Sequence, residues 1–155
     1  MTNSEKIKFK ELLKKECGFV LKKRSINSNS AMQDSQESAN NQEKSSAGDK
    51  YETSRAMGQI DRDMHAYQLL ETEKDMNIIT NLEIDKINQV IKPGSVFEIN
   101  SQLIFVAIGL GTILVNNISV LVISYKSPLY EQLKFKTVGD HVFFKNENHQ
   151  IETIF

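Results

Sequence analysis

Three carboxylates lie in and around a polar stretch, residues 40–51, that separates two long segments without proline. Glu43 and Asp49 flank the middle of this stretch, and Glu52 follows it. Mg²⁺ typically takes one or two protein carboxylates and completes its shell with water and substrate oxygens, so carboxylates on a projecting tip are candidate ligands. Each acid also has a structural explanation, because Asp49 suits a helix cap and Glu43 and Glu52 suit a solvated helix face.

The sequence contains no recognised catalytic motif. It has no P-loop, GxSxG, HExxH or glycine-rich dinucleotide turn. His65, His141 and His149 share no spacing, and the single cysteine, Cys17, excludes an intramolecular disulfide and a CxxC metal knuckle. We therefore predict that the protein is not an enzyme and binds no cofactor stably. The N-terminus opens into charged residues without the apolar core of a signal peptide, which predicts a cytoplasmic protein.

Two helices are predicted to position the tip. Residues 5–42 have an apolar stripe that thins after Leu21, so that 25–48 also fits a disordered linker in composition. Residues 47–80 are more regular: Met57, Ile60, Met64 and Tyr67 follow the 3, 4, 3 spacing of a heptad seam, and Leu70 continues it. Ser46 and Asp49 have the spacing of a capping box at the start of the second helix.

The apolar positions predict an antiparallel hairpin centred near residues 44–45. In this register Met32 lies opposite Met57, Val20 opposite Leu70, and Leu12 opposite Ile78. Ser25 would face Met64 and Ser28 would face Ile60, where the pairing is thinner. The sequence therefore predicts a coiled-coil hairpin over residues 1–80 with its tip near 43–49.

The second half of the chain, residues 81–155, alternates short apolar runs with turn signals. Candidate strands are 95–100, 103–108, 112–115, 119–124, 141–145 and 150–155, with a short helix that opens at Ser127-Pro128. The uncharged stretch 103–123 is long enough to span a membrane, but its glycines, asparagines and β-branched residues favour strands joined by a turn. The predicted fold class is thus α+β, with a small antiparallel sheet and one short helix after the helical hairpin.

Charge is distributed unevenly although the net charge is only −1. Residues 25–85 hold twelve acids against five basic residues, whereas residues 1–24 hold eight basic residues against three acids. The acidic segment coincides with the predicted tip and second helix. Such a projection would be attracted to a basic surface or to a bound cation.

This layout resembles the GreA/GreB transcript cleavage and elongation factors. The C-terminal half carries the more specific match, in Ser127-Pro128-Leu129, Leu133 and the Gly139-Asp140 turn, with Phe135 where the family usually has glycine. The resemblance implies a bacterial protein with an FKBP-like C-terminal domain that docks at the rim of the RNA polymerase secondary channel. Ser127, Pro128, Leu129, Gly139 and Asp140 are the implied docking candidates.

The predicted tip departs from the family pattern Asp-x-x-Glu-Asn-x-Glu-Tyr. With its tyrosine aligned on Tyr51, Lys44 and Ala47 take the positions of the two metal-associated acids, and Lys50 takes that of the second glutamate. Arg55 matches a basic residue that often follows. Glu43 and Asp49 lie close enough for a rearranged tip to use them instead.

The resemblance implies a monomeric factor that inserts its hairpin into the polymerase channel and meets nascent RNA or DNA only through that complex. Mg²⁺ would then be shared with the polymerase active site, and any RNA cleavage would belong to the polymerase. Two alternatives remain: an adaptor that dimerises through the Met57–Tyr67 seam, and a protein anchored in a membrane by residues 103–123.

Overall fold

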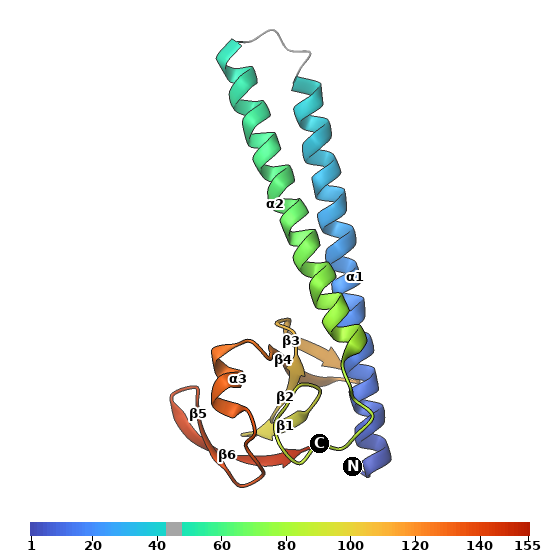
Figure 1. Ribbon diagram of the computed structural model, residues 1–155, viewed down its shortest axis with the longest axis vertical. Helices are drawn as coiled ribbons and strands as arrows, with labels where there is room; N and C mark the ends of the chain where they lie inside the picture. Colours follow the sequence, from blue (N-terminus) through green and yellow to red (C-terminus); the bar gives the residue numbers. More distant parts are fainter. Residues whose placement is uncertain (43–47) are drawn as a thin grey trace. The chain divides into compact units, whose positions relative to one another are not determined.

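A computed structural model describes residues 1–42 and 48–155. Two long helices, α1 (Asn3–Gln42) and α2 (Gly48–Asn81), pack together and precede a six-stranded sheet and the short helix α3 (Pro128–Leu133) (Figure 1). The chain divides into two compact units: a sheet unit of residues 1–18 and 78–155, and a hairpin unit of residues 19–77. The predicted boundary after residue 80 falls in the last turn of α2.

Helix α1 begins with a reciprocal cap that the sequence analysis missed. The Thr2 hydroxyl accepts a hydrogen bond from the Glu5 amide at 3.3 Å, and the Glu5 carboxylate accepts one from the Thr2 amide at 2.6 Å. This capping box satisfies backbone donors that a helix start leaves without intrahelical partners. The helix then continues to Gln42, so residues 25–42 are helical and do not form the alternative linker. The Ser46–Asp49 cap falls partly outside the described residues.

The sheet has the strand order β3-β4-β2-β1-β6-β5. Its strands are β1 (Val96–Ile99), β2 (Gln102–Ala107), β3 (Gly111–Val115), β4 (Ile118–Ser124), β5 (His141–Phe144) and β6 (Glu147–Ile154). Strands β2 and β4 pair in parallel, and the other pairs are antiparallel. The sheet is therefore mostly antiparallel, and the prediction of an antiparallel sheet is wrong for this one pair. All six predicted strands and the predicted short helix are confirmed, with ends displaced by up to three residues.

Tight turns join the strands that are adjacent in sequence. Two residues with positive φ separate β1 from β2, β3 from β4, and β5 from β6: Asn100-Ser101, Asn116-Asn117 and Lys145-Asn146. Two consecutive left-handed residues make a type I′ turn, whose twist matches that of the strands it connects. The stretch 103–123 therefore lies in β2, β3 and β4, and no helix in the described part of the chain is long and apolar enough to cross a membrane.

The core of the sheet unit gathers side chains from the sheet, the connector and α3. Ile91, Phe97, Ile104, Leu133 and Ile151 are fully buried members of this cluster. The first turns of α1 add buried Phe9 and Leu13, and the Phe9 ring lies 6.5 Å from that of Phe155 between ring centroids. The burial of these large apolar side chains is the main favourable contribution to the stability of this unit.

Two lysines of α1 bind the connector that follows α2. Lys14 Nζ donates to the carbonyls of Thr80 and Leu82, each at 2.9 Å, and Lys10 Nζ donates to the Lys86 carbonyl at 2.7 Å. The Lys14 contacts engage carbonyls at and just beyond the end of α2, where a helix lacks intrahelical donors. Lys10 is fully buried. Burial and the nearby charge of Lys92 lower the pKa of Lys10 to about 8.

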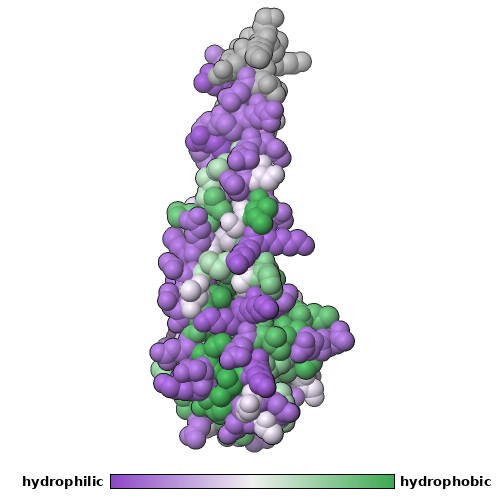
Figure 2. Space-filling model, turned by 90° about the vertical axis from the view of Figure 1, so that its right-hand side faces the viewer, coloured by the Kyte–Doolittle hydropathy of each residue, from purple (hydrophilic) through white to green (hydrophobic). Residues whose placement is uncertain are grey.

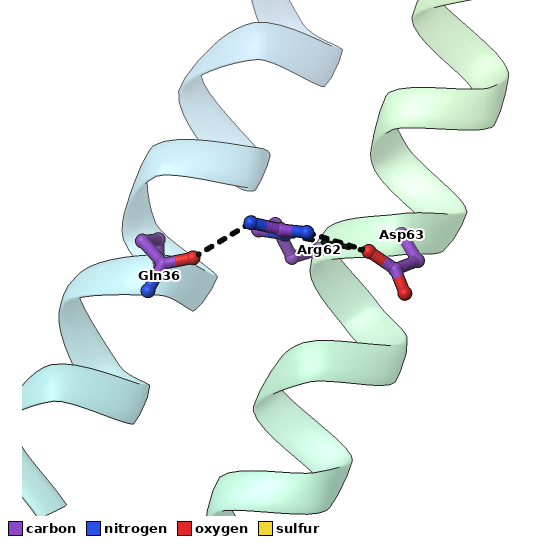
Figure 3. A network of polar contacts seen from close by, with 3 residues as sticks. All are labelled: Gln36, Arg62 and Asp63. Carbon is purple, nitrogen blue, oxygen red and sulfur yellow. Dashed lines mark hydrogen bonds and ion pairs between the residues drawn. The ribbon is translucent and has the colours of Figure 1, made fainter. Parts of the chain in front are cut away.

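The hairpin unit buries very little. Among its described residues, Leu21 and Thr72 are the buried ones. The side chains between the arms are mostly small or polar: Arg62 of α2 donates to Gln36 of α1 at 3.3 Å and to its neighbour Asp63 at 3.0 Å (Figure 3). Thr72 donates its hydroxyl to the Gln68 carbonyl at 2.9 Å. The arms therefore meet without an extended apolar seam.

The predicted seam does not lie between the helices, and that prediction is wrong. Met57, Ile60, Met64 and Tyr67 are 62%, 66%, 49% and 64% exposed. Arg62 and Ala66 line a groove together with Met32 and Gln36 of α1. Two positions along an α-helix rotate a side chain by about 200°, so Ile60 and Met64 point away from the α1-facing side that Arg62 and Ala66 mark. A heptad spacing identifies an apolar stripe but not the element that covers it.

The predicted pairing register is displaced for the same reason. Ser28, expected opposite Ile60, lines a groove with Tyr67, Gln68 and Glu71. Ser25, expected opposite Met64, lines one with Thr72 and Met76. The true partners lie about two helical turns further along α2.

We predict that the Lys10→Met variant loses part of the pH dependence of stability. The unfolded chain keeps the Lys10 proton up to about pH 10.5, whereas the folded chain releases it from about pH 8. Folding therefore releases a proton above pH 8, and the free energy of unfolding of the wild type should rise by about 1 kcal/mol between pH 8 and 9 relative to the variant. Urea unfolding at pH 7, 8 and 9 measures this difference.

Burial raises the pKa of the Cys17 thiol from its ordinary value of 9.0 to about 12. Above pH 9 this thiol therefore lowers the free energy of unfolding as the pH rises, which is opposite to the effect of Lys10, and the measurements stop at pH 9. Cys17 is present in both proteins, so its contribution cancels in the comparison. Equal pH slopes for wild type and variant would contradict the assignment to Lys10.

Candidate functional site

The acidic tip candidates are only partly described by the structure. Glu43 lies outside the described residues, as do Lys44 and Ala47. Asp49 belongs to the first turn of α2, and its side chain is outside the described part of the structure. Glu52 is an exposed residue of α2. Within residues 1–42 and 48–155, no group of three or more His, Cys, Asp or Glu side chains is arranged to hold a metal ion.

The residues of the C-terminal motif have well-defined local roles in the sheet unit. Ser127 is the N-cap of α3, and its hydroxyl accepts a hydrogen bond from the Tyr130 amide at 3.2 Å. Pro128 occupies the first turn, where its missing amide hydrogen costs nothing. Leu129 packs, half-buried, against the core cluster. These three residues therefore fix how α3 begins and how it is attached to the sheet.

Gly139 and Asp140 close a loop between α3 and β5. Gly139 has a φ of 93°, its amide donates to the Ile151 carbonyl at 2.9 Å, and its carbonyl accepts from Gln150 Nε2 at 3.1 Å. The Asp140 carboxylate accepts from the Thr137 amide at 2.7 Å and from the Thr137 hydroxyl at 3.1 Å. These hydrogen bonds, the backbone one first, lower the pKa of Asp140 and keep the loop in one conformation.

Phe135, just after the end of α3, adopts a conformation that is unfavourable for an aromatic residue. Its φ is 64°, in the left-handed region where glycine is favoured, and its side chain is 70% exposed. The Phe135 amide donates to the Ile91 carbonyl at 2.9 Å, which holds the backbone in place. Val138 in the same loop and Phe143 on β5 are also exposed, at 55% and 63%. In the sequence, Phe135 is marked only by its departure from the GreA/GreB pattern, which usually has glycine there.

His65 lies on α2, whereas His141 and His149 lie on the paired strands β5 and β6, opposite Gln150 and Val142. His65 Nδ1 lies 3.4 Å from Gln68 Oε1 on α2. His149 Nε2 lies 3.5 Å from Glu147 Oε2 on β6, and His141 is exposed on β5. The buried Cys17 thiol, with its pKa raised to about 12, is unsuited to act as a nucleophile at neutral pH.

Comparison with known proteins adds no family assignment: a scan against protein-family models, a search of curated proteins and a search of solved structures each found no match.

We expect the Phe135→Gly substitution to stabilise the protein by about 1 kcal/mol, because it removes the left-handed strain while sacrificing little buried surface. The matched control is Phe135→Ala, which removes the same ring but keeps a Cβ in the left-handed conformation and should not be stabilised. Urea unfolding of the three proteins tests this, and a glycine variant no more stable than the alanine variant would show that Phe135 is not strained.

Proposed function

We propose that this chain is a Gre-like regulator of transcription that binds bacterial RNA polymerase by inserting its helical hairpin into the secondary channel. The observation that carries the proposal is the order of the elements. Two long helices, joined through residues 43–47, are followed by a six-stranded sheet that bears a Ser-Pro helix start and a Gly-Asp turn.

The length of the arms supports insertion into a deep channel. Within the hairpin unit the arms are residues 19–42 of α1 and 48–77 of α2, and these 24 and 30 residues correspond to about 36 Å and 45 Å at 1.5 Å per residue. Apart from the exposed apolar residues Met57, Ile60, Met64 and Tyr67 of α2, the polar surface of the arms is compatible with a water-filled passage. On the face drawn in Figure 2, hydrophilic side chains predominate on the hairpin, and apolar side chains appear as separate patches.

The conformation of the C-terminal motif supports the same resemblance. Phe135 stands where the family usually has glycine, and its φ of 64° is one that glycine favours. Gly139 likewise has a positive φ, and Ser127 caps α3. We propose on this basis that the sheet is FKBP-like and that Ser127, Pro128 and Leu129, with Gly139 and Asp140, form the surface that docks on polymerase.

We propose that the protein occupies the channel, and we favour this role over delivery of Mg²⁺ for RNA cleavage. Lys44 and Ala47 replace the two metal-associated acids of the family pattern. A lysine cannot ligate Mg²⁺, which requires oxygen donors. Asp49 and Glu52 remain the acids near this end of α2, and a cleavage role would depend on them and on Glu43.

Removal of the outer part of both arms should abolish polymerase binding. The variant replaces residues 33–65 with a short glycine-rich turn, because Met32 and Ala66 line the same groove and can be joined without a change of register. We expect at least a tenfold loss of affinity for core polymerase in co-sedimentation or biolayer measurements. Circular dichroism of the shortened protein checks that its sheet is retained. Binding within twofold of the full chain would refute hairpin insertion.

We expect that the full chain does not raise the rate of RNA cleavage in backtracked complexes above the intrinsic rate of polymerase. We also expect it to slow the cleavage that an added GreA or GreB protein stimulates. Gel analysis of labelled RNA in stalled complexes measures both effects. Asp49→Ala and Glu52→Ala should compete as well as the wild type. RNA shortening by the wild type that Asp49→Ala removes would instead assign Asp49 to metal binding.

A further inference from the structure

The side of α2 that faces away from Arg62 and Ala66 carries an exposed apolar surface, and Tyr67 at its edge also lines a groove with Ser28 of α1. We call the four residues Met57, Ile60, Met64 and Tyr67 the α2 stripe. Their exposed fractions run from 49% to 66%, and Leu70 at its border is 50% exposed. Exposed apolar side chains that recur at 3, 4, 3 spacing form one continuous ridge along a helix, unlike the singly scattered apolar residues that are normal on surfaces.

A contact that covers the α2 stripe would stabilise the hairpin unit. Leu21 is the buried apolar side chain among its described residues, whereas the stripe alone exposes four large ones. Burying a large apolar side chain contributes about 1.5–3 kcal/mol, so covering the stripe would add substantially to a unit that has almost no core. Methionine and tyrosine side chains adapt well to a partner surface.

The edges of the stripe are acidic. Asp61 and Asp63 flank Ile60 and Met64, and Glu71 follows Tyr67 after one helical turn. Asp63 pairs with Arg62 at 3.0 Å but keeps 63% of its side chain exposed. Glu71 pairs with Lys74 at 2.8 Å. A partner that carries lysine or arginine beside its apolar face would complement these carboxylates, as the e and g positions of coiled coils do.

A second copy of the same stripe is a poor occupant. In an antiparallel self-pair, Asp61 would face Asp61 of the other copy and Asp63 would face its own counterpart, which is unfavourable. In a parallel self-pair, Asp61 would lie opposite Ala56 and Asp63 opposite Gln68, so neither carboxylate gains an opposite charge.

We propose that the α2 stripe is the docking site for an amphipathic helix of another protein, with an apolar face bordered by lysine or arginine. The partner helix lies along α2, inserts its apolar side chains between those of Met57, Ile60, Met64 and Tyr67, and places its basic side chains near Asp61 and Asp63. The proposal does not rest on polymerase binding, since it requires only the exposed side of α2. A partner helix and an enclosing polymerase channel would compete for this part of the hairpin.

The test uses two synthetic helices of about four heptads with leucine and isoleucine at the a and d positions. One carries lysine at e and g, and the other carries glutamate. Fluorescence anisotropy of each labelled peptide is followed as the full chain is added. We expect the lysine peptide to bind at least tenfold more tightly than the glutamate peptide, and to bind more weakly as salt is raised.

Substitutions on the two helices locate the site. Met64→Glu should lower the affinity of the protein for the lysine peptide at least tenfold, while Met64→Leu should leave this affinity unchanged. Ile26→Glu is the matched control, because Ile26 is a 69% exposed apolar residue on α1 and its substitution should have no effect. Methionine and glutamate have similar helix propensities, and circular dichroism confirms that each variant stays folded.

Four results would overturn the proposal. Absence of binding by the lysine peptide, or equal binding of the two peptides, would show that the stripe does not select a basic-edged helix. A dimer of the wild type in light scattering that Met64→Glu converts to a monomer would show that a second copy occupies the stripe. Equal losses for Met64→Glu and Ile26→Glu would place the peptide elsewhere.

Discussion

The hydrogen bonds from Lys10 and Lys14 to the connector after α2 are the constraint that holds the first turns of α1 in the sheet unit. They join two segments separated by more than sixty residues in sequence, and they supply donors for carbonyls at and beyond a helix end. Because Lys10 is fully buried, its ammonium must keep this partner or lose its proton. The first turns of α1 thus belong energetically with the sheet, together with Phe9 and Leu13.

Secondary structure could be predicted closely from the sequence because local signals agreed. Alternating β-branched residues, paired turn residues such as Asn116-Asn117 and the Ser127-Pro128 helix start each specify a conformation within a few residues. Lateral packing could not be predicted in the same way. The strongest heptad pattern, Met57–Tyr67, faces outward, while Arg62 and Ala66 face α1, and a single periodic stripe does not reveal its partner.

In the candidate site, too, some features could be predicted from residue type and others could not. The conformations of Ser127, Gly139 and Asp140 follow from residue type, since a cap, a positive φ and a side-chain acceptor for turn amides each suit few residues. The strained backbone of Phe135 could not be foreseen, because phenylalanine carries no local preference for that conformation. The buried Lys10 is equally unexpected, since lysine is almost never fully buried. The functions of Glu43, Asp49 and Glu52 depend on a partner, and residue type alone leaves cap, solvated face and metal ligand equally open.

Among the described residues of the hairpin unit, 19–42 and 48–77, buried apolar side chains are nearly absent, and this has a consequence for motion in the unit. Segments that bury little surface open locally with a smaller free energy than the whole protein requires for unfolding. The backbone amides of this unit should therefore exchange with solvent hydrogen through partial openings, while those beside Phe97, Ile104 and Ile151 exchange only when the sheet unfolds. Binding in a polymerase channel or to a partner helix would then slow the exchange of the amides that it covers, and these protected amides would mark the contact surface.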